Sequence, residues 1–480
     1  MKMRWIRTLP VFLVCFLAAL PAAADVSFVR EIAPILLKRC TGCHGERANL
    51  GGYRTHTYQN LMRMGASGQA VVVPGKPNAS RLFRLITAQA EAVRMPRSDE
   101  PLSAVQIELL RKWILEGAKF DGSDPTTPLK SLSGPRVHPA APAVYRVPVP
   151  VLALAFKPGG QELAVGGYHE VTLWNPATGA LLRRLQHLPQ RIQALAFSRD
   201  GKQLLVGGGT PGEYGEVALV DPATGERTKV LDTFSDIVLS AAFSPDGKRI
   251  VAGGADAGVR AYETESGKRL WVSNIHADWV TSVCFSSDGK FVASASRDMT
   301  VKIHEAQDGA LFTTYNGHNR QIGAHRGAAP VYAVRFDPAS DLAYSAGGGK
   351  WIQVWDPIKA KAESGDAGDM EERFAKDGHA RYIAHGFQQD VYALAVRDGQ
   401  LFAASADGAL KQFDLSTLQP VRTYSGYRDW VFTLDYDAAS HRVAGGSYGG
   451  EVRVWDTQTG RPLAAFQAQP GALSNPIGTL

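Results

Sequence analysis

The feature that most constrains the fold is a repeat that occupies residues 150–470. In each unit an apolar strand ends in an anchor residue, a turn and a small-residue strand follow, and a third strand ends in a residue pair. The anchors are Phe156, Phe197, Phe243, Phe285, Phe336, Val396 and Tyr436. The pairs are Trp174-Asn175, Val220-Asp221, Tyr262-Glu263, His304-Glu305, Trp355-Asp356, Phe413-Asp414 and Trp455-Asp456. Seven units, spaced about 40 to 46 residues apart where no insertion intervenes, predict an all-β, closed, seven-bladed propeller of four-stranded blades.

These units resemble the WD-repeat family. The Trp-Asp pair is intact at 355–356 and 455–456 and has diverged elsewhere. The resemblance implies a protein-binding platform and no reaction centre. Residues 461–466 are expected to supply the outer strand of the last blade. Residues 144–149 either add a further strand where the first and last blades meet or remain part of the linker.

The N-terminal residues have the composition of an export signal. Basic residues precede an apolar run from about Leu9 to Leu20, and small residues follow it up to Ala24. This series predicts a cleaved signal peptide at residues 1–24 and a periplasmic protein. The alternative is an uncleaved anchor, but the run is shorter than the roughly 20 residues that span a bilayer. We expect no membrane span in the mature chain.

Three further segments complete the predicted organisation. Residues 25–122 are expected to form a small all-α domain, residues 123–149 a Pro-rich linker, and residues 471–480 a tail. Residues 25–122 carry 14 lysines and arginines against 9 acidic residues, which suits an acidic redox partner or an ordinary solvated surface. No basic run is interleaved with aromatic residues, so we expect no nucleic-acid partner.

The sequence Cys40-Thr41-Gly42-Cys43-His44 predicts one covalent haem c. On one helical turn, thiols at i and i+3 face the same side and can bond the two vinyl groups of a haem, while His44 lies under the iron as an axial ligand. A redox dithiol, half of a zinc site and a short-loop disulfide are the competing interpretations. No βαβ setting and no second ligand pair accompany the motif.

The second axial ligand must come from another segment. Met95 lies in a Pro-containing loop before a predicted helix over about 103–118, so its position is firmly held. Met62 and Met64 lie on a predicted amphipathic helix at about 58–64, where filling the core is the default role. His56 is a further candidate ligand, and a five-coordinate iron would have no second protein ligand at all.

The N-terminal domain resembles planctomycete-type cytochrome c domains. The resemblance rests on Ile32-Ala33-Pro34-Ile35-Leu36 before the Cys-x-x-Cys-His motif, Val73-Pro74-Gly75-Lys76-Pro77, Met95-Pro96, and the segment from Leu102-Ser103 to Gly117-Ala118. It implies Cys40 and Cys43 as haem attachments, His44 as proximal ligand and Met95 as distal ligand. The family often has two prolines after this methionine, whereas here Arg97 follows Pro96.

Two insertions in the repeat each carry a pair of histidines. His318 and His325 precede one inner strand, and His379 and His385 precede the next. His325 and His385, like His276, lie where the family places a structural histidine, which leaves His318 and His379 as the surplus pair. The four histidines are candidates for turn chemistry, for a partner or ligand surface, or for a metal site.

The remaining polar residues of the repeat have structural explanations. Asp256, Asp298 and Asp407 lie in turns where an aspartate is expected to hydrogen-bond the loop before the blade. Cys284 and His304 lie in strands and are expected to be core residues.

The function that follows is a periplasmic electron-transfer protein, which is favoured over an enzyme. His and Met ligation leaves no open iron position, so one-electron transfer is expected, with the propeller binding an unidentified redox partner protein. Two different functions stay open: a redox sensor or assembly scaffold, and an oxidoreductase with a second cofactor or substrate site on the propeller.

Overall fold

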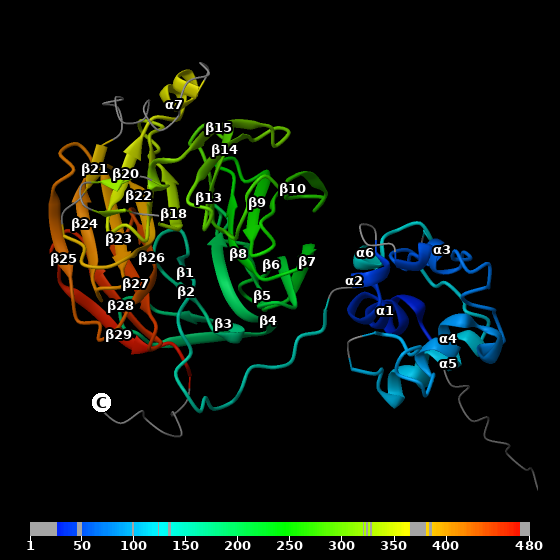
Figure 1. The fold of residues 1–480 in the computed structure, drawn as a ribbon. Helices are drawn as coiled ribbons and strands as arrows, with labels where there is room; N and C mark the ends of the chain where they lie inside the picture. The colour runs from blue at the N-terminus through cyan, green and yellow to red at the C-terminus, as the bar shows by residue number, and fades with distance from the viewer. Residues whose placement is uncertain are drawn as a thin grey trace, which may run out of the picture. The chain divides into compact units, whose positions relative to one another are not determined.

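The structure is a computed structural model that describes residues 26–45, 50–97, 100–122, 124–132, 136–319, 321–322, 325–326, 329–364, 381–383 and 386–470. The predicted signal peptide and the predicted tail lie outside these residues. Two compact units make up the chain: a helical unit, Met1–Arg136, and a sheet unit, Val137–Leu480 (Figure 1). A helical N-terminal region followed by antiparallel sheets confirms the coarse fold prediction.

The helical unit is built from short helices around one core. Its α-helices are α1 (Ala33–Arg39), α2 (Thr41–His44), α3 (Tyr58–Leu61), α4 (Arg81–Ile86), α5 (Ala104–Leu115) and α6 (Leu129–Leu132). A π-helical turn covers Phe28–Ile32, and 3-10 turns cover Leu50–Gly52 and Pro77–Ala79. Helix α5 begins in a capping box, in which Ser103 Oγ accepts a hydrogen bond from Gln106 N and Gln106 Oε1 accepts one from Ser103 N.

Aromatic packing connects α5 to the start of the helical unit. Trp113 is 1% exposed, its ring lies 5.4 Å from that of Phe28, and its Nε1 donates to Lys119 O at 2.9 Å. Ile32 immediately precedes α1, and Leu36 lies on α1. Both are fully buried and belong to the same core cluster. The position of α1, and of the Cys-x-x-Cys-His segment that follows it, therefore depends on this core.

Part of the predicted linker folds onto the helical unit. Leu129 and Leu132 form the apolar side of α6 and are buried in the core, where α6 contacts α1. Leu129 N donates to His56 O at 2.8 Å. The extended linker predicted for residues 123–149 is therefore wrong over α6, because these two leucines gain apolar burial that a solvated connector lacks.

The sheet unit consists of antiparallel strands that follow one another in chain order. Its first strands are β1 (Leu154–Phe156), β2 (Leu163–Gly166), β3 (Tyr168–Trp174), β4 (Leu181–Phe197), β5 (Leu204–Thr210), β6 (Tyr214–Val220), β7 (Arg227–Phe234), β8 (Val238–Phe243), β9 (Arg249–Gly254), β10 (Val259–Glu263) and β11 (Arg269–Ser273). The next are β12 (Val280–Phe285), β13 (Phe291–Ser296), β14 (Val301–Glu305), β15 (Leu311–Tyr315), β16 (Gln321–Ile322) and β17 (His325–Arg326). The last are β18 (Val331–Phe336), β19 (Ala343–Gly347), β20 (Ile352–Trp355), β21 (Arg381–Ile383), β22 (Val391–Arg397), β23 (Gln400–Ser405), β24 (Leu410–Asp414), β25 (Pro420–Tyr424), β26 (Val431–Asp437), β27 (Arg442–Ser447), β28 (Glu451–Asp456) and β29 (Pro462–Gln467). A 3-10 turn at Gly317–Asn319 and a helix, α7 (Pro357–Ser364), lie between strands.

Most strands group into four-stranded sheets, and one exception has a clear cause. Strand β4 is 17 residues long, and it pairs with β3 through Leu181–Gln186 and with β5 through Arg191–Phe197. One continuous strand thus ends one four-stranded unit and begins the next, which produces a single sheet from β1 to β7. The predicted repeat anchors fall at or next to the ends of the first strand of each unit.

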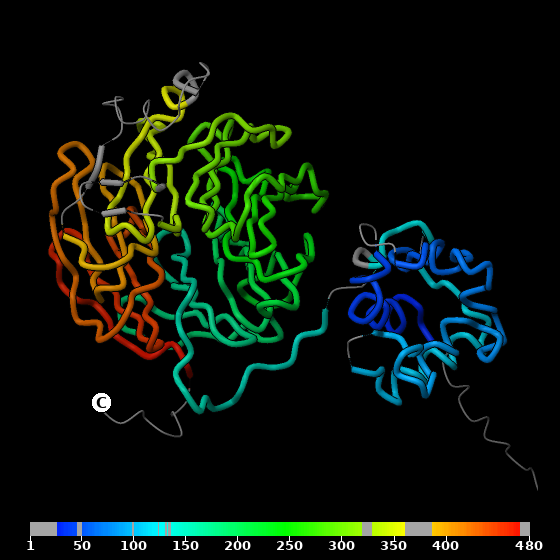
Figure 2. Tube along the Cα trace, in the orientation of Figure 1, coloured from blue at the N-terminus to red at the C-terminus, as the bar shows by residue number. Residues whose placement is uncertain are grey.

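The innermost strands contact one another in chain order: β1, β4, β8, β12, β18, β22 and β26 (Figure 2). Strand β26 also contacts β1. Strand β29 pairs with β28, which agrees with the expectation that residues 461–466 supply an outer strand. The two ends of the sheet unit meet through Val151 N donating to Ser447 O at 3.0 Å and Gln469 Nε2 donating to Val149 O at 2.7 Å.

Two polar clamps hold residues 137–149 on the sheet unit. His138 Nε2 lies 3.1 Å from Glu216 Oε2, with both side chains nearly inaccessible to solvent. Tyr145 donates a short hydrogen bond to Glu170, whose side chain is 1% exposed. Because a buried carboxylate needs partners, these contacts fix the segment instead of leaving it as a free linker.

Among the described residues, no helix has the length and apolar character needed to cross a membrane.

We expect Trp113→Ala to destabilise the helical unit by about 3–5 kcal/mol, because it leaves a cavity next to Phe28. Hydrogen exchange of peptides covering α1 and α5 in the full chain measures this loss. The matched control is Leu115→Ala on the same helix, where the side chain is 52% exposed. Equal protection in the two variants would contradict the prediction.

Candidate functional site

Cys40, Cys43 and His44 lie on a helical corner. Cys40 is the residue between α1 and α2, and its N donates to Leu36 O at 2.9 Å. Its carbonyl accepts hydrogen bonds from Cys43 N at 3.3 Å and His44 N at 2.9 Å. The two thiols and the imidazole are therefore presented by one turn, with a break in the helix at Cys40 that the sequence did not predict.

Both thiols of the corner are free. Cys40 is half-buried and Cys43 is exposed. Burial raises the pKa of Cys40 to about 11, an effect that the neighbouring Arg39 charge opposes. A thiol with a raised pKa is a poor nucleophile in disulfide exchange, so the corner does not resemble an activated redox dithiol.

His44 is held at its backbone while its ring nitrogen lacks a partner. Its carbonyl accepts from Thr55 N at 2.6 Å and from Thr55 Oγ1 at 3.2 Å. The ring lies 5.7 Å from the ring of Tyr53. Among the described residues, no group hydrogen-bonds the solvent-inaccessible Nδ1 of His44. An imidazole with unmet hydrogen-bonding capacity on a rigid turn fits an iron ligand.

The candidates for a second ligand have different surroundings. Met95 is half-buried, and its N donates to Leu85 O at 3.0 Å, which holds the loop against α4. Met62 packs against the core of the helical unit, whereas Met64 is 68% exposed. His56 Nε2 lies 3.4 Å from Asn60 Nδ2. Met95 thus has the restrained, partly accessible side chain that an axial ligand needs, and its role stays a prediction.

The donor set on the helical unit fits a c-type haem. Cys40 and Cys43 are available for covalent attachment, and His44 supplies an imidazole nitrogen for the iron. Met95 is a thioether on a restrained loop.

Comparison with protein-family models matches residues 40–99 to planctomycete cytochrome C. Residues 225–263, 267–305, 310–356 and 418–456 match the WD domain, G-beta repeat. The chain joins a planctomycete-type cytochrome c domain to WD repeats. Both predicted resemblances are therefore confirmed, and the cytochrome c match implies haem c binding.

Part of the chain is also similar to a known protein. The guanine nucleotide-binding protein subunit beta of Zea mays is 27% identical over 99 residues, which are 20% of this chain and 26% of that protein. The match therefore spans about a quarter of this relative's length.

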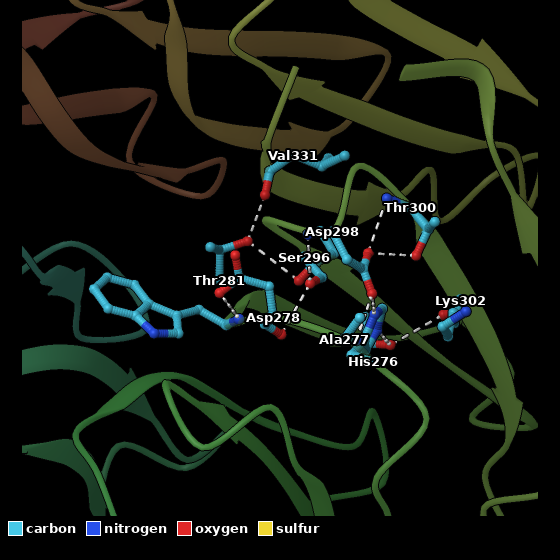
Figure 3. A network of polar contacts seen from close by, with 12 residues as sticks. His276, Ala277, Asp278, Thr281, Ser296, Asp298, Thr300, Lys302 and Val331 are labelled. Atoms are coloured by element: carbon cyan, nitrogen blue, oxygen red, sulfur yellow. Dashed lines mark hydrogen bonds and ion pairs between the residues drawn. The ribbon is translucent and has the colours of Figure 1, made fainter. Parts of the chain in front are cut away.

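A polar network in the WD repeats surrounds His276. Its Nδ1 lies 2.8 Å from Asp298 Oδ2, and its Nε2 lies 2.8 Å from Ser294 Oγ. Figure 3 shows the Asp298 carboxylate between Thr300 and the His276–Ala277 segment. Burial alone would raise the pKa of Asp298, but hydrogen bonds from His276, Thr300 and Ala277 N lower it below the ordinary value.

The three turn aspartates do not all have the predicted role. Asp298 bonds Ala277 N in the loop before β12, and Asp407 accepts from Gln388 N before β22, as expected. Asp256 instead pairs with Arg260 at 2.7 Å within its own turn and strand. Cys284 and His304 are buried, 8% and 0% exposed, which agrees with a core position.

His318, one of the surplus pair of insertion histidines, lies inside a blade. His318 is 5% exposed, and its Nε2 lies 2.9 Å from Ser345 Oγ, which also accepts from Trp355 Nε1 at 3.1 Å. It therefore occupies the structural position that was expected for His325. Burial lowers the pKa of His318 to about 3. Two histidines seven residues apart are equivalent in the sequence, and only the path of the chain decides which one enters the blade.

The structure does not bring the other three insertion histidines together in a site. His325 lies in β17, and its side chain is outside the described residues. His379 and His385 also lie outside the described residues. Among the described side chains, no group of three or more His, Cys, Asp or Glu could hold a metal ion.

A cavity of about 540 Å³ at the starts of the inner strands was not predicted from the sequence. Its lining consists of Leu152, Gln193, Leu239, Ser240, Trp279, Thr281, Ser282, Arg297, Pro330, Tyr332, Ala333, Arg335, Tyr392, Ala393, Phe432 and Thr433. The feature of the sequence that could have indicated this cavity is an aromatic residue in the second position of β18, β22 and β26.

We expect the stability of the sheet unit to fall as the pH decreases from about 6.5 toward about 3, in part because of His318. The folded state keeps this imidazole neutral while the unfolded chain binds a proton below its ordinary pKa, so acid favours unfolding. His318→Gln should lower the stability at pH 7 by about 1–3 kcal/mol and weaken the pH dependence. Urea unfolding at pH 7 and pH 5, with His441→Gln at an exposed position as control, measures both effects. An unchanged pH dependence in His318→Gln would rule out the effect.

Proposed function

We propose that this chain is a periplasmic c-type cytochrome that transfers single electrons and binds its redox partner through the WD-repeat region. The observation that carries the proposal is the Cys40–His44 corner, in which two free thiols and a histidine with an unpartnered Nδ1 share one turn. The corner lies at the start of the segment that matches planctomycete cytochrome C.

Each residue of the site has one role in the proposal. Cys40 and Cys43 would attach one haem covalently, and His44 and Met95 would hold its iron. When bound, the haem supplies a reversible one-electron couple, and two protein ligands favour outer-sphere transfer over oxygen activation. The hydrogen bonds from Thr55 N and Oγ1 to His44 O, and from Met95 N to Leu85 O, restrain the backbone of both residues.

We also propose that the sheet unit is a closed propeller of seven blades. The contact between β26 and β1 supports closure. One apolar cluster contains Val151, Leu154 and Phe156 from the start of the unit together with Val452 and Val454 from β28. Trp174 stacks on Phe466 at 4.2 Å. The ends therefore meet through side-chain packing and single hydrogen bonds, while β1 and β29 belong to different sheets.

The predicted export signal at residues 1–24 supports a periplasmic location. A c-type haem and a platform for proteins in the same chain support a redox partner as the ligand of the repeats. The rival hypothesis of an enzyme used the insertion histidines as ligands of a second cofactor. His318 does not support the enzyme hypothesis, because its Nε2 is already hydrogen-bonded to Ser345 Oγ.

The mature protein should show one reversible one-electron couple in voltammetry, with haem that stays on the denatured chain in mass spectrometry. Cys40→Ala and Cys43→Ala together should release the haem on denaturation, because the thioether bonds are lost. Turnover of a small molecule by the lone protein, or a second cofactor in its optical spectrum, would contradict electron transfer as the sole function.

A variant at the proposed distal ligand is detected by its optical spectrum and its reduction potential. Met95→Ala should lose the sulfur-to-iron charge-transfer band and shift the reduction potential to a lower value, because a thioether favours reduced iron. Met64→Ala, at a side chain that is 68% exposed, is the matched control and should leave both unchanged. A Met95→Ala spectrum identical to the wild type would rule out Met95 as the ligand.

A further inference from the structure

Residues 53–59, the proximal segment, hold the histidine of the proposed haem site. Thr55 is 1% exposed and donates to His44 O twice, from its N at 2.6 Å and from its Oγ1 at 3.2 Å. The ring of Tyr53 lies 5.7 Å from the ring of His44, and the Tyr53 hydroxyl donates to Leu61 O at 3.0 Å. The position of His44 therefore depends on how firmly the proximal segment is itself held.

Residues 124–132, the connector, contact the proximal segment through their backbone. Gln59 N donates to Pro125 O at 2.9 Å, Thr57 pairs with Pro128 in an antiparallel bridge, and Leu129 N donates to His56 O at 2.8 Å. These contacts reach the residues that directly follow Thr55. The backbone on the C-terminal side of the His44 clamp is thus fixed by a stretch of chain about 70 residues away in the sequence.

The connector has anchors of its own. Leu129 and Leu132 are buried in the same core cluster as Leu36, and α6 contacts α1 (Figure 1). At the start of the connector, Asp124 Oδ1 accepts hydrogen bonds from Thr126 N at 2.8 Å and from Thr126 Oγ1 at 2.7 Å, which is a turn that aspartate favours. The buried leucines and this turn fix the backbone that contacts the proximal segment.

The connector lies outside the segment that matches planctomycete cytochrome C, which ends at residue 99. Its contacts with the proximal segment are therefore a feature of this chain that the family match does not describe. Groups that hold a metal ligand without touching the metal fix the orientation of the ligand and tune the metal. The connector reaches His44 in this way, through Thr55.

We propose that the connector is a positioning element for His44 and that Leu129 anchors it. Burial of Leu129 fixes the connector, the connector fixes residues 56–59, and Thr55 passes this restraint to the backbone of His44. A ligand that is held in place beforehand requires little rearrangement when the charge of the site changes. The inference rests on the proposed function, because the restraint acts on electron transfer only when His44 binds the haem iron.

Leu129→Ala in the mature, haem-loaded chain tests this role. The ferric low-spin electron paramagnetic resonance signal should broaden or split, and the haem methyl resonances should shift, because His44 then adopts more than one orientation. Hydrogen exchange of a peptide covering residues 53–61 should become at least about tenfold faster. Leu129→Met fills a similar volume and should restore the wild-type signals.

A second leucine separates positioning from a general loss of stability. Leu110 on α5 is 1% exposed, and the main contacts of α5 are with the π-helical turn, α4 and the 3-10 turn at Pro77–Ala79. Leu110→Ala removes the same atoms from the same core. It should leave the magnetic signals and the exchange of residues 53–61 as in the wild type.

A milder pair of variants acts on the Thr55 contact itself. Thr55→Val removes the hydroxyl that donates to His44 O and keeps the backbone hydrogen bond, whereas Thr55→Ser keeps both. The valine variant should change the magnetic signals in the same way as Leu129→Ala, and the serine variant should match the wild type. This pair carries the test should Leu129→Ala fail to fold.

Three results would overturn the inference. These are wild-type magnetic signals in both Leu129→Ala and Thr55→Val, equal changes in Leu110→Ala and Leu129→Ala, or a Leu129→Met chain that differs from the wild type as much as Leu129→Ala does. With a reversible haem couple in the wild-type chain, each of them leaves the proposed function standing. A wild-type chain that carries no covalent haem would overturn the proposed function and the inference together.

Discussion

The sheet unit depends on burial between neighbouring sheets. Each strand alternates its side chains between two faces, so a four-stranded sheet of small and branched residues must be covered on both sides. The apolar clusters are accordingly shared by adjacent sheets. One joins β18–β20 to β22–β24, and another joins β22–β24 to β26–β28. A further cluster joins β1–β3 to β27 and β28, so the same force that stacks the sheets also brings the chain ends together.

This arrangement leaves the first strands of the units at the centre, where half-buried residues of these strands line a shared cavity. Side chains buried between sheets are fixed by packing, whereas those at the starts of the inner strands are free of that constraint. Tyr332, Tyr392 and Phe432 occupy such positions, each as the second residue of its strand. The polar networks of His276 and His318 are different, because their hydrogen bonds are satisfied inside the blades. Burial thus separates the histidines, which hold loops in place, from the aromatic residues that line the cavity.

In the helical unit, a small core holds the Cys40–His44 corner in position. Phe28, Trp113 and the apolar side of α1 hold the corner at Cys40, and the corner presents thiols and an imidazole on one turn. Its chemistry requires few residues, and the surrounding packing restrains them. Redox chemistry and partner binding can therefore be assigned to separate units, each with its own core.

The sequence by itself determined the features that depend on local pattern. The Cys-x-x-Cys-His spacing, the capped helix that contains Trp113 and the recurring strand anchors each reflect a short-range rule, and family matches confirm both regions. Only the tertiary structure decided which histidine enters a blade, that Leu129 and Leu132 fold back onto α1, and that Arg335 faces a cavity with aromatic neighbours from other strands. These outcomes depend on contacts between residues far apart in the chain, and no local pattern of hydrophobicity or spacing encodes them.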